Sequence, residues 1–102
     1  MKIAVAATKS DISADVSYYG GRAPFYLLFD EQGALLDSFT NPFSEMDRHA
    51  GYEVSKMMAE LGVDIFIAGL FGPTMISELS GQGIKCVTKS GSVQDAVLQL
   101  DM

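Results

Sequence analysis

Hydrophobic and polar positions follow two different periods along this chain, and the change of period divides it into two halves. In the first half, short apolar runs predict strands at residues 2–7, 24–30 and 34–40. Residues 31–33 separate the second and third runs and predict a hairpin turn that ends in Gly33. Residues 8–21 are rich in Ser, Asp and Gly and predict a long loop after the first strand.

The second half alternates between a helical period and short apolar runs. Residues 47–61 predict a helix that ends before Gly62, with one apolar face formed by Ala50, Val54, Met57, Met58 and Leu61. Residues 63–68 predict a strand covered on both faces, and Gly72 with Pro73 predicts the start of a second helix. A short strand at residues 84–88 precedes a third helix, whose start is indicated by Ser92 and Asp95.

This order of elements predicts an α/β fold. Strands followed by alternating strands and helices favour a mixed five-stranded sheet with three flanking helices. The hairpin makes the third strand antiparallel to the second, and we also expect the second strand to be antiparallel to the first. We expect one domain over residues 1–102, because a chain of 102 residues fits the usual size of a single domain.

Charge and cysteine usage exclude several classes of partner. The net charge is −6, and the seven Lys and Arg residues are scattered, so no basic surface for nucleic acid or an anionic membrane is expected. The apolar run at residues 65–71 is far shorter than the roughly 20 residues of a membrane span. A single cysteine gives no internal disulfide. We therefore expect a soluble, cytoplasmic protein.

The residue types needed for catalysis are sparse. His49 is the single histidine and Cys86 the single cysteine, and they fall at a predicted helix start and inside a predicted strand. Cys86 shares its side of that strand with Ile84, so we expect it to be buried and unreactive. His49 could cap the helix, form a hydrogen bond or coordinate a metal. Residues 2–7 contain no acidic residue of the kind a ribonuclease H-type nuclease needs. The sequence therefore predicts no enzyme.

The most promising ligand site is the carboxyl edge of the parallel strands, where open α/β sheets bind ligands. The strand ends there lead into residues 8–9, 69–72 and 89–91. The last two turns run into helix N-termini, which favour anions. Arg22 could reach such an anion, or it could pair with a surface carboxylate. Neither glycine-rich nucleotide fingerprint is present.

Several short motifs follow one another in a characteristic order. They are residues 1–7, GRAPF at 21–25, NP at 41–42, HAG at 49–51, GVD at 62–64, AG at 68–69 with GP at 72–73, GIK at 83–85 and SGSV at 90–93. Together they resemble, over essentially the whole chain, the dinitrogenase iron–molybdenum cofactor biosynthesis family, which includes NifX, NafY and the C-terminal part of NifB. The resemblance implies a ribonuclease H-like fold without nuclease activity.

The resemblance also implies a non-catalytic carrier of an anionic metal–sulfur cluster of the Fe–S, Mo–Fe–S or Mo–Cu–S (thiomolybdate) type, with cluster donor and acceptor proteins as partners. The sulfides of such a cluster complete its metal coordination, so the protein supplies charge and hydrogen bonds. His49 is the candidate metal ligand. The candidate binding residues are Gly20, Gly21, Arg22, His49, Phe71, Gly72, Ser90 and Gly91. The alternative is a small regulatory or interaction domain that keeps the fold without the cluster, which the lack of further thiols favours.

Overall fold

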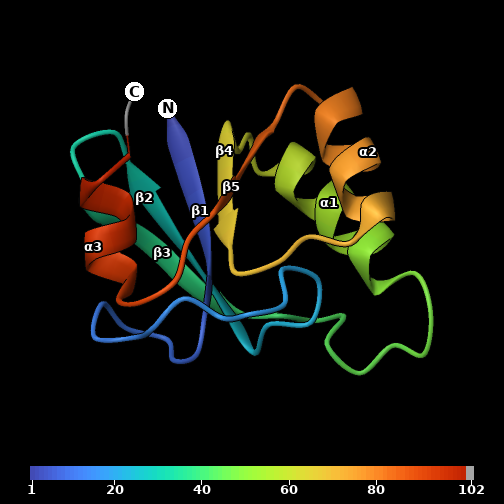
Figure 1. The fold of residues 1–102 in the computed structure, drawn as a ribbon, viewed down its shortest axis with the longest axis horizontal. Helices are drawn as coiled ribbons and strands as arrows, with labels where there is room; N and C mark the ends of the chain where they lie inside the picture. Colours follow the sequence, from blue (N-terminus) through green and yellow to red (C-terminus); the bar gives the residue numbers. More distant parts are fainter. Residues whose placement is uncertain (101–102) are drawn as a thin grey trace.

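The chain folds into one mixed sheet with helices on both faces (Figure 1). The computed structural model describes residues 1–100. Its elements are β1 (Lys2–Ala7), β2 (Phe25–Asp30), β3 (Leu35–Thr40), α1 (Ala50–Glu60), β4 (Ile65–Ala68), α2 (Pro73–Gly81), β5 (Lys85–Thr88) and α3 (Val93–Leu98). The strand order is β3-β2-β1-β4-β5, with β1 antiparallel to β2 and parallel to β4. The predicted five-stranded α/β architecture is confirmed.

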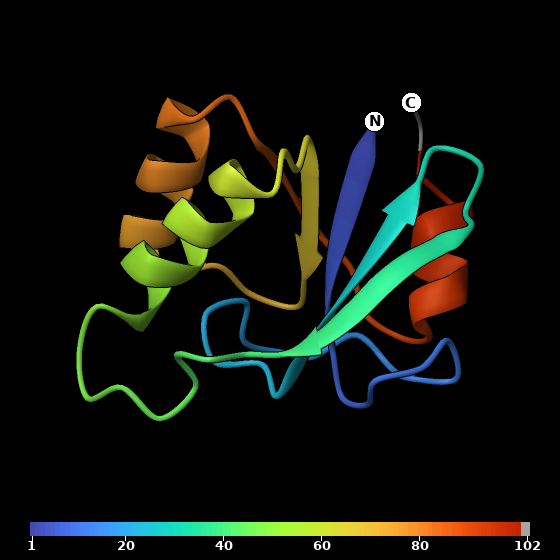
Figure 2. The ribbon, with the colours of Figure 1, turned by 180° about the vertical axis from the view of Figure 1, so that it is seen from behind.

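Each face of the sheet carries its own hydrophobic core, because successive side chains of a strand point to opposite faces. Ala4 and Ala6 of β1 pack in the core beneath α1 and α2, together with Tyr26 and Phe66. The intervening residues of β1 and β4 pack against α3 instead. The view from behind shows α3 alone on its side of the sheet (Figure 2). The central strands are thus covered on both faces, so their carboxyl ends remain as the place where loops can form a site.

Three local signals in the sequence produce the expected turns and caps. The Oδ1 atom of Asp30 accepts hydrogen bonds from the backbone N–H groups of Gln32 and Ala34, both at 2.9 Å, and closes the β2–β3 hairpin. Gly62 ends α1 with a φ of 75°, which glycine adopts without steric cost. Ser92 Oγ accepts a hydrogen bond from the Asp95 N–H at 3.1 Å and caps α3.

The first helix begins at Ala50, three residues later than its periodicity predicts. His49 has a φ of 63° and a ψ of 15°, so it lies in the left-handed region and cannot continue a right-handed helix toward residue 47. With 11 residues, α1 is the longest helix. None of the helices within residues 1–100 has the length and apolar character needed to cross a membrane.

Cys86 differs from the expectation of full burial. Its side chain packs against the core beneath α1 and α2, on the same side as Ile84, as predicted. The residue is nevertheless only partly buried, because β5 is an edge strand with a neighbour on one side alone. Burial raises the pKa of the Cys86 thiol. The thiol is therefore partly accessible and biased toward its neutral form.

Candidate functional site

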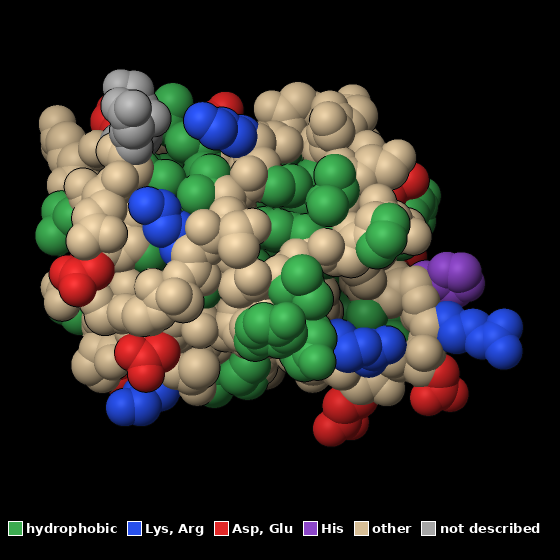
Figure 3. Space-filling model, in the orientation of Figure 1, with side chains coloured by type: hydrophobic (Ala, Val, Ile, Leu, Met, Phe, Trp, Pro, Cys, Tyr) green, Lys and Arg blue, Asp and Glu red, His purple; other side chains and the backbone are tan. Residues whose placement is uncertain are grey.

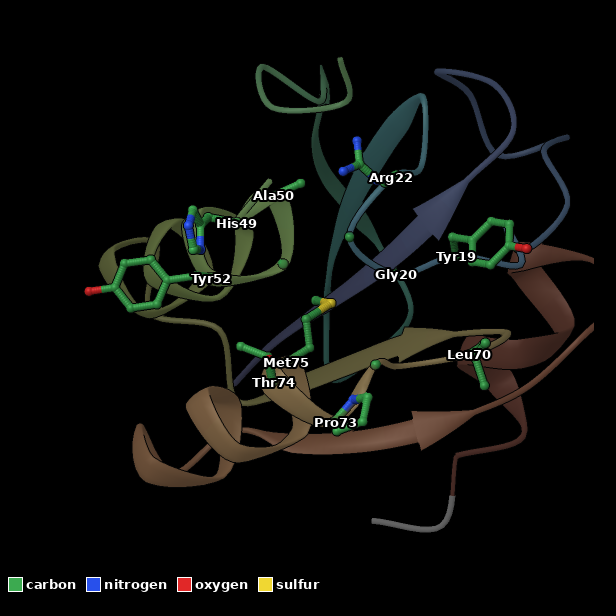
Figure 4. Close-up of a pocket in the computed structure, with 13 residues that line it drawn as sticks. Tyr19, Gly20, Arg22, His49, Ala50, Tyr52, Leu70, Pro73, Thr74 and Met75 are labelled. Carbon is green, nitrogen blue, oxygen red and sulfur yellow. The ribbon is translucent and has the colours of Figure 1, made fainter. Parts of the chain in front are cut away.

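A cleft of about 480 Å³ opens where the N-termini of α1 and α2 meet the loop that precedes β2 (Figure 4). Because this loop follows β1, and residues 69–72 follow β4, the cleft lies at the carboxyl edge of two neighbouring parallel strands. This is the edge where the sequence predicts a ligand site. Its lining residues are Tyr19, Gly20, Gly21, Arg22, His49, Ala50, Gly51, Tyr52, Leu70, Gly72, Pro73, Thr74 and Met75.

Five of the eight predicted site residues meet in this cleft: Gly20, Gly21, Arg22, His49 and Gly72. Phe71 does not, because its side chain turns into the core, is 7% exposed and packs edge-on against Phe66. A Cβ added to Gly20 would lie 3.2 Å from the Phe71 ring, so Phe71 supports the loop from beneath. The expectation that Phe71 lines the site is wrong for that reason.

Ser90 and Gly91 also lie outside the cleft. They form the turn before α3, and α3 covers the opposite face of the sheet from α1 and α2 (Figure 1). The loop after β1 runs between this turn and the cleft: the Val16 N–H donates to the Gly91 carbonyl at 2.8 Å, and the Gly69 N–H donates to the Ser17 carbonyl at 2.9 Å. The turn at residues 89–91 is thereby separated from the turn at residues 69–72, although both were expected to contribute to one ligand site.

Free backbone donors gather in the cleft. The first turn of an α-helix has N–H groups without an acceptor inside the helix. In α1 these belong to Ala50, Gly51 and Tyr52, and in α2 to Thr74 and Met75, and none finds an acceptor within residues 1–100. Neither helix has a side-chain cap at its N-terminus. Five donors and the positive ends of two helix dipoles therefore meet in one cleft, which favours an anion.

The charged side chains around the cleft point to the same class of ligand. Among the described residues 1–100, Arg22 is the only Lys or Arg side chain of the lining, and His49 is its only histidine. Within residues 1–100 no Asp or Glu lines the cleft, although the chain as a whole carries a net charge of −6. Hydrophobic side chains gather near the centre of the face seen in Figure 3. Tyr19 and Leu70, which line the cleft, are both exposed. The cleft is thus a non-acidic, partly apolar hollow in an acidic protein.

Arg22 is held by backbone carbonyls rather than by a carboxylate. Its Nη1 donates to the carbonyl oxygens of Ser44 at 3.2 Å and Met46 at 2.5 Å, and its Nη2 reaches that of Asp47 at 3.4 Å. These three bonds use three of the five N–H donors of a guanidinium group. The side chain therefore ties the loop before α1 to the loop before β2, and two of its five N–H donors have no partner within residues 1–100.

A buried polar pair supports the cleft from below and was not anticipated from the sequence. The Tyr26 hydroxyl donates to the Gly20 carbonyl at 2.5 Å and accepts from Asn41 Nδ2 at 3.1 Å. The same Nδ2 lies 2.9 Å from the Ala23 carbonyl. In the sequence pattern, Tyr26 is one of several aromatic residues of a predicted strand. Asn41 stands beside Pro42 at the end of the next strand. Only their contact in the fold reveals that they shape the loop.

The cleft offers few side-chain ligands for a metal. Among residues 1–100, no three His, Cys, Asp or Glu side chains come together in a way that could hold a metal ion. His49 lines the cleft at the N-terminus of α1, whereas Cys86 lines a separate groove beside β5. His49 and Cys86 therefore line different hollows of the surface.

Comparison with known proteins identifies the family of this chain. The family model described as dinitrogenase iron-molybdenum cofactor matches residues 1–102. The chain belongs to this family. No curated protein sequence matches the chain significantly. The family takes its name from the iron–molybdenum cofactor of dinitrogenase.

Solved structures agree on the fold of this family member. The apo form of the orange protein from Desulfovibrio gigas has a TM-score of 0.90 and 24% identity, over 96% of this chain and 84% of that chain. TM1290 from Thermotoga, assigned as a NifB protein of the DUF35 family, has a TM-score of 0.78 and 24% identity, over 94% and 83%. The Methanocaldococcus jannaschii protein mj0327, assigned as a dinitrogenase, has a TM-score of 0.63 and 14% identity, over 95% and 84%. At these identities the likeness establishes the arrangement of elements.

Proposed function

We propose that the cleft binds an anionic metal–sulfur cluster without covalent attachment and that the chain acts as a carrier for it. The observation that carries this proposal is the meeting of five free N–H groups, two helix N-termini and Arg22 in a cleft without an acidic side chain. Membership of a family named for such a cofactor supports the choice of anion. A carrier of this kind takes the cluster from a donor protein and releases it to an acceptor protein.

The chemistry of the lining fits a cluster that arrives already assembled. Backbone N–H groups and a guanidinium donate charge-assisted hydrogen bonds to cluster sulfides, and helix dipoles stabilise the negative charge. His49 stands at the edge of the cleft as a candidate for one metal–nitrogen bond. Within residues 1–100 the lining contains no Cys, Asp or Glu side chain beside His49. We therefore propose binding without catalysis.

The test is reconstitution under anaerobic conditions. The protein is incubated with ferrous iron and sulfide, or with tetrathiomolybdate and copper, and is then desalted for metal counting and a visible spectrum. We expect metal retention in at least one mixture. Arg22→Ala should remove a charge-assisted contact worth about 1.5–3 kcal/mol and weaken retention at least about tenfold. Arg48→Ala is the matched control, because it removes the same charge from an exposed side chain outside the cleft lining.

Two results would contradict the proposal in different ways. If the wild-type protein retains no metal from either mixture, the cleft binds a non-metal anion or a protein partner, and the chain is a regulatory or interaction module. The absence of a three-ligand group of His, Cys, Asp or Glu within residues 1–100 favours that second candidate. If Cys86→Ala alone abolishes retention, the cluster is bound by the thiolate in the groove beside β5 and not in the cleft.

A further inference from the structure

The N-terminal turns of α1 and α2 touch at a glycine. A Cβ placed on Gly51 would lie only 2.7 Å from Cγ of Met75, closer than real Cβ atoms approach another heavy atom. Glycine is a poor helix former, so its position in the first turn of α1 calls for a packing reason. The contact with Met75 supplies that reason: a side chain at position 51 would require the buried Met75 side chain or the helices themselves to shift.

The loop before β2 packs into the same contact. A Cβ on Gly21 would lie 3.2 Å from the Met75 sulfur and 3.2 Å from Cα of Gly51. Met75 is 3% exposed and reaches from α2 into the centre of the lining residues (Figure 4). The Met75 side chain therefore packs between α1, α2 and the loop before β2, and each of these three segments contributes to the cleft.

We propose that the Gly51–Met75 contact sets the separation of the two helix N-termini and thereby determines the size of anion that the cleft binds. This inference rests on the proposed function, because it concerns the same cleft. The free N–H groups of Tyr52 on α1 and Thr74 on α2 can donate to one anion only at a suitable separation, since a hydrogen bond weakens steeply with distance and misalignment. A wider separation of the two N–H groups therefore weakens the binding of a compact anion more than the binding of a larger one.

The experiment is a double-mutant cycle with tetrathiomolybdate as the probe. Gly51→Ala should force the helices apart and raise the dissociation constant about tenfold, the effect of losing one good hydrogen bond. In the double variant Gly51→Ala/Met75→Ala, the new Cβ meets only the Cβ of residue 75, at an ordinary 3.9 Å. We expect the double variant to bind more tightly than Gly51→Ala even though loss of the Met75 side chain lowers its thermal midpoint. If the Gly51–Met75 contact served only stability, the affinity of each variant would fall in parallel with its thermal midpoint.

A matched control and a milder variant complete the design. Gly81→Ala makes the same change at the other end of α2, where the added Cβ has no atom within 4 Å, and should leave the dissociation constant unchanged. Gly21→Ala produces 3.2 Å contacts instead of a 2.7 Å contact and should weaken binding less than Gly51→Ala does. If Gly51→Ala does not fold, Gly21→Ala decides in its place, because its Cβ presses on both Met75 and Gly51: weakened binding supports the inference and wild-type affinity overturns it.

The outcomes separate this inference from the proposed function. Wild-type affinity in Gly51→Ala and Gly21→Ala overturns the inference and leaves the carrier proposal standing. Equal weakening in the single variant and in the double variant also overturns it, because relief of the contact then restores nothing. If the wild-type protein binds no tetrathiomolybdate and retains no reconstituted iron–sulfur cluster, the proposed function fails and the inference about ligand size fails with it.

Discussion

The hydroxyl of Tyr26 joins two loops, because it accepts a hydrogen bond from Asn41 Nδ2 at 3.1 Å and donates one to the Gly20 carbonyl at 2.5 Å. Both side chains are buried: Tyr26 is 0% and Asn41 2% exposed. Every buried side-chain nitrogen and oxygen within residues 1–100 has a hydrogen-bond partner. A fully satisfied buried network of this kind rigidifies its surroundings. Here the surroundings include the loop that forms one wall of the cleft.

Tyr26→Phe should destabilise the protein without creating a cavity in the apolar core. The substitution leaves the buried Gly20 carbonyl without its donor, which costs about 1–3 kcal/mol. Urea unfolding measures the change. Tyr18→Phe is the matched control, since Tyr18 is 59% exposed and its loss of a hydroxyl should stay within about 0.5 kcal/mol. Equal stability of both variants would show that the hydroxyl does not hold the loop.

The stability of the folded chain should fall at alkaline pH. Burial raises the pKa of the Tyr26 phenol above its ordinary value of about 10. Above that pH the unfolded chain releases a proton that the folded chain keeps, so the unfolded state binds fewer protons and the free energy of unfolding decreases as pH rises. Urea unfolding at several pH values between neutral and strongly alkaline gives the slope. The Tyr26→Phe variant should show a smaller slope, and an unchanged slope would contradict the assignment.

The left-handed backbone of His49 predicts a difference between two substitutions that both remove the imidazole. Asparagine tolerates a φ of 63°, whereas a β-branched residue does not. His49→Val should therefore be less stable than His49→Asn by about 1–2 kcal/mol, as judged by thermal unfolding. If the imidazole is a metal ligand, both variants should lose cluster retention equally. Equal stability would mean that the loop before α1 relaxes out of this conformation.

Cys86 should react slowly with a thiol reagent in the native protein and rapidly once the protein is unfolded. The thiol is partly buried and its pKa is raised, so less of the reactive thiolate is present at a given pH. The rate of labelling at mildly alkaline pH, with and without denaturant, measures the difference. A native rate equal to the unfolded rate would show that the edge strand β5 does not protect its cysteine.

Much of the fold was determined by the sequence through local chemistry. The carboxylate of Asp30 and the positive φ of Gly33 form the hairpin from within five residues, and Gly62 and Ser92 end or begin their helices in the same local way. Periodicity placed the strands and the buried faces, because a residue's side of a strand or helix depends only on its position in the repeat. The general rule about sheet edges pointed to three turns, and of these only residues 69–72 contribute to the cleft, through Leu70 and Gly72.

The details of the cleft were decided only by the tertiary structure. Ser90 and Gly91 lie outside it because the loop after β1 passes between their turn and the cleft, a path that composition does not encode. Gly51 meets Met75 across 24 positions of sequence, and Tyr26 meets Asn41 across 15. Such contacts depend on the angle and distance at which whole elements pack, and these are set by the sum of all core side chains. The rule about sheet edges therefore predicted the edge at which the cleft lies, and packing decided which residues line it.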